Sequence, residues 1–185
     1  MNEELEPKLI RQLGASNLFK FVRPELKVID EEAGRFRAIV STEDVDRDGD
    51  IIRAAGWQLD RFESHPVLVG GHDYRSIRSQ IGEWEGMEIK GGKAGKRLEG
   101  EGRYYIGEGN ADADWGWAIA SKGRAAFSVG FIPDWNKAVE IEGAAKGIWP
   151  NFEFNGQELL EVSHVVIPSN AQALQRSGFD NLPPY

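Results

Sequence analysis

Residues 81–106 read IGEWEGMEIKGGKAGKRLEGEGRYYI and carry the clearest fold signal in the chain. Apolar residues recur in both halves of this stretch, and a glycine-rich segment from Lys90 to Lys96 separates the halves. Glycine permits the backbone angles of tight turns, so the pattern predicts a β-hairpin with arms at Ile81 to Ile89 and Leu98 to Ile106. Two glycines inside the second arm favour a bulge there.

Shorter strand signals lie on both sides of this hairpin. Phe36, Ala38 and Val40 occupy alternate positions, and this period of two is typical of a half-buried strand. Three further apolar runs predict strands; they are Pro66 to Gly70, Ala125 to Ile132 and Leu159 to Ile167.

One helix is predicted after the hairpin. Asn110 can cap its first turn, and Gly123 marks its end. Trp115, Ala118 and Ile119 would form its apolar stripe. Strands outnumber helices, so we expect a mainly β fold with some α (α+β), built as an antiparallel β-barrel-like core surrounded by a few short helices.

The chain reads as one domain with two extensions. Residues 1–17 are polar and acidic and predict an N-terminal arm, residues 18–175 hold the strand signals of the domain, and residues 176–185 predict a flexible tail. Hydrophobic residues make up 41% of the 185 positions, enough for a packed core.

Charge and composition exclude several function classes. The net charge of -8 repels phosphate backbones, so nucleic acid is not expected as a partner. The absence of cysteine excludes a thiol nucleophile and a disulfide framework. No stretch approaches the roughly 20 apolar residues of a membrane helix, and no signal peptide is visible. We therefore expect a soluble, cytosolic protein without membrane contact.

The loop from Asp44 to Asp50 resembles the start of a calcium-binding loop. Four aspartates stand at alternate positions, with Gly49 in the sixth place. Ala55 stands where a bidentate glutamate is needed, which favours a polar turn whose aspartates bond to their own backbone. A calcium-binding β-domain is kept as an alternative.

His72 and Ser128 are the candidates for nucleophilic chemistry. His72 follows an apolar strand and two glycines, so its imidazole can project from a strand end, and an ordinary pKa near ~6.5 suits a general base. Ser128 lies between Ala126 and Gly130, which leave space around its hydroxyl for an approaching peptide. The alternative for Ser128 is a structural serine packed beneath a helix.

The last predicted strand carries Glu161 and His164. A carboxylate amid leucine and valine needs a partner, because burying it unpaired is costly, and a histidine is a natural partner. A Ser–His pair also needs a third group that orients the imidazole, and either residue could serve. They differ by an odd number of positions, so a regular strand points them to opposite faces and only one can face His72.

Four blocks in order resemble the HK97-type prohead proteases of tailed bacteriophages. They are the DRDGD-I loop with a following Gly-Trp, the apolar strand ending in GHDY, the AFSVGF-P block, and ELLEVS-VVIPSNAQAL. The resemblance runs from about Phe36 to Leu174. That family is related in fold to the herpesvirus capsid-maturation proteases, the assemblins, so a herpesvirus-protease-like fold is implied.

The resemblance implies a serine endopeptidase that works inside the assembling prohead, in the cytoplasm of the bacterial host. It would cut the scaffold or the scaffold-like arm of the coat protein, and itself, without a cofactor or metal. His72, Ser128 and Glu161 match the family's catalytic blocks. His164 is the alternative third residue of the catalytic triad, because the herpesvirus relatives use a second histidine there. Those relatives also imply a homodimer.

Two further points stay open at this stage. The turn from Pro168 to Ala173 is a candidate for holding the oxyanion, although the sequence does not assign the donors. A catalytically inactive capsid-assembly or scaffold-binding module of the same fold is the alternative to an enzyme.

Overall fold

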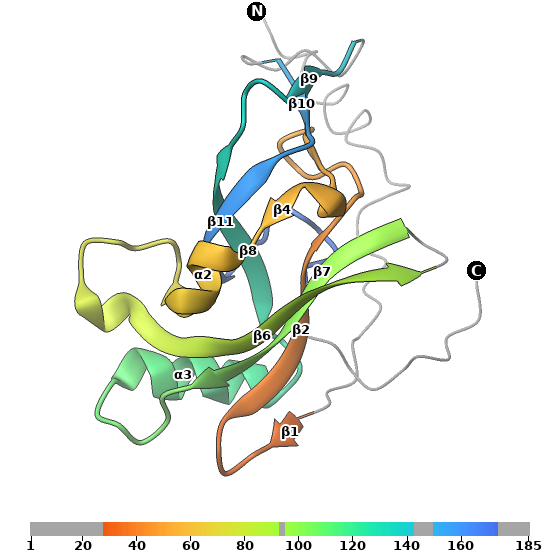
Figure 1. Ribbon diagram of the computed structural model, residues 1–185. Coiled ribbons are helices and arrows are strands. Elements are labelled where there is room, and N and C mark those ends of the chain that lie inside the picture. Colours follow the sequence, from red (N-terminus) through yellow and green to blue (C-terminus); the bar gives the residue numbers. More distant parts are fainter. Residues whose placement is uncertain (1–27, 93–94, 143–149, 174–185) are drawn as a thin grey trace, which may run out of the picture.

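The fold is described from a computed structural model, for residues 28–92, 95–142 and 150–173. Figure 1 shows a strongly curved sheet with short helices at its periphery. The predicted arm at residues 1–17 and the predicted tail at residues 176–185 lie outside the described residues.

In the part of the chain that the structure describes, the main sheet has eight strands. Its strands follow the order β1 (Val28–Asp30), β2 (Arg35–Thr42), β7 (Gly95–Tyr104), β6 (Gln80–Gly92), β5 (Val67–Gly70) and β11 (Gln157–Val165). Strand β4 (Trp57–Gln58) pairs with the same edge of β11 as β5 does. Strand β8 (Ala126–Pro133) pairs with the other edge of β11. A small second sheet joins β3 (Ile51–Ile52), β10 (Phe152–Phe154) and β9 (Val139–Glu140). Among the described residues the helices are α2 (Asp60–Ser64) and α3 (Ala111–Ala120), with 3-10 turns at Ala54–Gly56 and Ile77–Ser79.

The mainly β prediction is confirmed, and the predicted antiparallel β-barrel-like core is confirmed in part. The sheet is mixed and curls into a half-barrel, since β11 runs parallel to both β4 and β5. Parallel neighbours need a long crossover connection. Here the β6–β7 hairpin, α3 and β8 all lie between β5 and β11 in the chain, and they supply that connection.

The predicted hairpin is confirmed as β6 and β7, and its paired arms extend further than expected, to Gly92 and Gly95. The bulge lies on β6, between Trp84 and Gly86, and the prediction of a bulge in the second arm is wrong. Glycines in β7 serve close packing instead. A Cβ at Gly102 would lie 2.6 Å from the Phe36 ring, which leaves no room for a side chain.

Aromatic rings from four strands form the centre of the core. Phe36 of β2 stacks on Phe127 of β8 with ring centroids 5.2 Å apart, and Trp84 of β6 meets both rings edge-on. Tyr104 of β7 completes the cluster. Burying each such ring contributes about 2–3 kcal/mol, and this packing fixes β8, which carries Ser128, against the sheet.

Helix α3 packs differently from the prediction. Asn110 caps it as expected, and its side chain accepts a hydrogen bond from the Asp112 N–H. The predicted stripe is wrong, because Trp115 is 66% exposed and the buried positions are Ala113, Gly116 and Ala120. Small residues let the helix approach the Tyr104 ring closely.

Candidate active site

His72 lies in a tight turn directly after β5. Gly71 and His72 both have left-handed backbone angles, with φ of 63° and 56°. Glycine adopts this region freely, whereas a histidine there carries a conformational cost of about 1–2 kcal/mol. The turn returns the chain toward β11, since the Gly71 N–H donates to the His164 carbonyl at 2.9 Å. Strained residues of this kind are concentrated at functional sites.

Glu161 of β11 is the partner of His72. The residue is only 3% exposed, and its Oε1 lies 2.7 Å from His72 Nδ1. The hydrogen bond to this carboxylate raises the pKa of His72 above its ordinary value, against the opposing effect of burial. When Nδ1 donates to Glu161, the neutral ring keeps its lone pair on Nε2, where a base can act.

The Glu161 carboxylate has two further neighbours. The Tyr74 hydroxyl donates to Oε1 at 2.9 Å, although the tyrosine as a whole is 68% exposed. Burial and the nearby carboxylate raise the pKa of Tyr74 to about 12, so this hydroxyl stays a donor at neutral pH. On the other carboxylate oxygen, the Ser163 hydroxyl donates to Oε2 at 2.6 Å.

Gly130 makes room for this cluster. It lies opposite Glu161 in the β8–β11 ladder, and a Cβ there would overlap Glu161 Oε1 and lie 2.9 Å from the Tyr74 hydroxyl. The glycine of the SVGF block is therefore required by the close approach of a carboxylate.

Ser128 lies on the same face of the sheet as these groups. It stands directly opposite Ser163 in the antiparallel ladder, and directly opposed residues project to one face. Ser128 is partly buried. Among the described residues its hydroxyl makes no hydrogen bond to the His72 ring. In unliganded enzymes this contact is often long and tightens when substrate binds.

His164 is placed away from this cluster, as the odd spacing predicted. Its Nδ1 lies 3.0 Å from the buried Tyr104 hydroxyl, and its ring packs beside Phe127. Burial lowers the pKa of His164 to about 4, so the ring is neutral near pH 7. It lines a pocket of about 470 Å³ together with Gly71 and Trp115. The structure pairs Glu161, not His164, with His72.

The aspartate loop behaves as a polar turn. Asp46 Oδ1 accepts the backbone N–H groups of Asp48 and Asp50, both at 2.9 Å, which confirms the predicted bonding of aspartates to their own backbone. Asp48 also accepts a hydrogen bond from the Ser169 hydroxyl at 2.6 Å. The loop therefore anchors the segment that follows β11.

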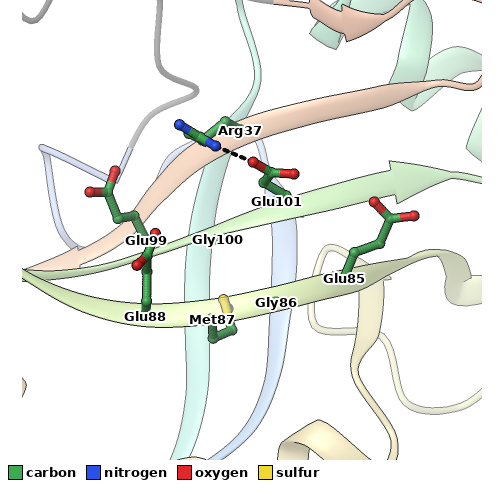
Figure 2. A pocket seen from close by; sticks show the side chains of 8 residues that line it. All are labelled: Arg37, Glu85, Gly86, Met87, Glu88, Glu99, Gly100 and Glu101. Carbon is green, nitrogen blue, oxygen red and sulfur yellow. Dashed lines mark hydrogen bonds and ion pairs between the residues drawn. The ribbon is translucent and has the colours of Figure 1, made fainter.

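A second hollow lies on the sheet formed by β2, β6 and β7. Figure 2 shows its acidic lining, in which Glu101 is paired with Arg37. Its volume is about 180 Å³, and Glu85 at its rim is bonded to Arg35 at 2.5 Å. None of the four sequence-predicted site residues lines this hollow.

Sequence reasoning missed Tyr74, Ser163 and Gly130 as parts of the site. The signal for Ser163 was available, because it stands two positions after Glu161 and shares its face. Gly130 could be recognised only once the register of β8 against β11 was known. Tyr74 follows His72 by two positions in a turn, where no periodicity indicates a direction.

Comparisons with protein-family models, with curated proteins and with solved structures found no match. Within residues 28–92, 95–142 and 150–173, no helix is long and apolar enough to cross a membrane.

Proposed function

We propose that this chain is a serine endopeptidase in which Ser128 is the nucleophile, His72 the general base and Glu161 the group that orients the base. The observation that carries the proposal is the 2.7 Å contact between His72 Nδ1 and the buried Glu161 carboxylate, on the face to which Ser128 projects. A buried acid, an imidazole and a hydroxyl in this order are the parts of a catalytic triad.

In the proposed reaction His72 Nε2 takes the proton of the Ser128 hydroxyl as its oxygen attacks the scissile carbonyl. Glu161 stabilises the imidazolium that forms, and the proton then passes to the leaving amine. Water hydrolyses the acyl-enzyme by the same route. Backbone N–H groups near Pro168 to Ala173 are the candidates for holding the oxyanion, since the Ala173 carbonyl bonds to the N–H of Phe127, next to Ser128.

The biological setting follows from the motif resemblance. We propose that the enzyme cuts scaffold protein or the scaffold-like arm of a coat protein, and itself, inside an assembling prohead in the host cytoplasm. The GHDY block supplies both His72 and Tyr74, and the ELLEVS block supplies both Glu161 and Ser163. These four residues form one hydrogen-bonded cluster, which supports reading the blocks as a single site.

A catalytically inactive capsid-assembly or scaffold-binding module of the same fold is the second candidate. The absence of a hydrogen bond between Ser128 and His72 within the described residues favours it. Such a module would keep the His72–Glu161 pair as a structural link between the turn and β11.

Cleavage assays separate the two candidates. Purified full-length protein is incubated alone and with a mixture of unfolded polypeptides, and products are identified by mass spectrometry. The endopeptidase proposal expects internal cleavage that Ser128→Ala abolishes. Ser41→Ala is the matched control, because Ser41 is a buried strand serine whose hydroxyl has no partner among the described residues. Equal cleavage by Ser128→Ala and the unmodified protein would end the proposal.

A further inference from the structure

The hydroxyl of Ser163 joins the two halves of the proposed acid–base pair. Ser163 lies in β11 and is 0% exposed. Its Oγ donates to Glu161 Oε2 at 2.6 Å and accepts the backbone N–H of His72 at 3.1 Å. One atom therefore contacts both the carboxylate and the main chain of the residue that carries the imidazole.

This bridge fixes the direction of the carboxylate. With Oε2 bonded to Ser163, Oε1 is the oxygen left for His72 Nδ1 and the Tyr74 hydroxyl. A carboxylate without the Ser163 contact could rotate about its terminal torsion, which is broad for glutamate. The 2.7 Å contact to the imidazole depends on that torsion.

The same bridge holds the turn. His72 has the left-handed φ of 56°, a conformation that persists only where surrounding contacts impose it. The hydrogen bond from its N–H to Ser163 is such a contact, and the bond from the Gly71 N–H to the His164 carbonyl is its neighbour. Two adjacent residues of β11 thus anchor two adjacent residues of the turn.

We propose that Ser163 is a positioning residue that sets the geometry of the His72–Glu161 pair from both sides. Ser163 is not a second nucleophile, because its hydroxyl is buried and both its donor and an acceptor position are engaged. The consequence for turnover rests on the proposed function, whereas the consequence for His72 does not.

The test compares Ser163→Ala with Ser41→Ala, which removes the same atom from another buried strand position without losing a hydrogen bond to the described residues. The pKa of His72 is measured by NMR titration in the full-length protein. We expect Ser163→Ala to lower the pKa of His72 toward the ordinary histidine value, and Ser41→Ala to leave it unchanged. Ser163→Thr, which keeps the hydroxyl, should restore the higher value.

Kinetics supply the second readout. The rate at which a serine-directed phosphonate reacts with Ser128 should fall about tenfold to a hundredfold in Ser163→Ala. The two hypotheses can fail separately. If Ser163→Ala lowers the pKa of His72 but the phosphonate does not react with Ser128 in the unmodified protein, the positioning role of Ser163 stands and the protease proposal fails. An unchanged pKa, an increase, or an equal fall in Ser41→Ala would overturn the positioning role.

A measurement on the unmodified protein covers the case in which Ser163→Ala does not fold. The His72 amide proton should exchange slowly with solvent, because its acceptor is fully buried, while the amides of the exposed residues Ser76 and Ile77 exchange quickly. Fast exchange at His72 would contradict the bridge.

Discussion

Ser128 and Ser163 stand directly opposite each other across β8 and β11, yet their hydroxyls have different environments. Ser163 is fully buried and bonded to Glu161, whereas Ser128 is partly exposed on the same face. A nucleophile must be reachable by a peptide, so the proposed function gives the role of nucleophile to Ser128 and a supporting role to Ser163.

Glu161 and His164 are the two candidates for the third residue of the catalytic triad, and substituting them should have opposite effects on activity. Glu161→Gln keeps the size of the side chain but removes the charge that stabilises the imidazolium, so peptide cleavage should fall by about a hundredfold to ten-thousandfold. His164→Gln should keep most of the activity, because His164 contacts Tyr104 and not His72. Initial rates of peptide cleavage measure both. A larger loss of cleavage in His164→Gln than in Glu161→Gln would instead make His164 the residue that orients His72.

The pH dependence of activity should reflect the His72–Glu161 contact. The base acts only when unprotonated, and Glu161 raises the pKa of His72, so kcat/KM should rise with pH and level off above a pKa higher than the ordinary ~6.5. In Glu161→Gln the midpoint should move to lower pH. A plateau reached below pH 6 in the unmodified enzyme would argue against His72 as the base.

A methyl group at position 130 should disturb the site from the opposite strand. Gly130→Ala places Cβ against Glu161 Oε1 and Tyr74, so the carboxylate must move away from His72. We expect a stability loss of about 1–3 kcal/mol together with loss of cleavage. Gly86→Ala is the control, because nothing lies within 4 Å of a Cβ there. Denaturant unfolding and cleavage rates measure both; full activity of Gly130→Ala would contradict the placement of Glu161.

His164 should make the fold sensitive to acid. Its pKa is about 4 in the folded state and near ~6.5 when unfolded, so the unfolded chain binds the proton more tightly. Stability should therefore fall as the pH drops from about 6.5 to below 4, by roughly 3 kcal/mol from this residue. In His164→Gln this contribution to the loss of stability at low pH should disappear, as measured by denaturant unfolding at several pH values. Identical pH dependence in both proteins would contradict the buried neutral imidazole.

The sequence was informative where a local pattern determines structure. Alternation of Phe36, Ala38 and Val40 predicted β2, and the odd spacing of Glu161 and His164 correctly predicted opposite faces. It failed where the answer depends on contacts between distant strands. The parallel pairing of β11 with β5 has no local signature, and the exposure of Trp115 follows from the close approach of α3 to Tyr104. The spacing placed Ser163 on the Glu161 face, but it could not predict the bond from the His72 N–H, because that residue lies in a turn 91 positions away.

Reaction of Ser128 with a serine-directed phosphonate tests the central claim most directly. The full-length protein is treated at neutral pH, the adduct is located by mass spectrometry, and its rate of formation is compared between the unmodified protein and His72→Ala. The account predicts one adduct, on Ser128, that forms about 10²–10⁴ times more slowly without His72. No adduct on Ser128, or equal rates in the two proteins, would contradict it.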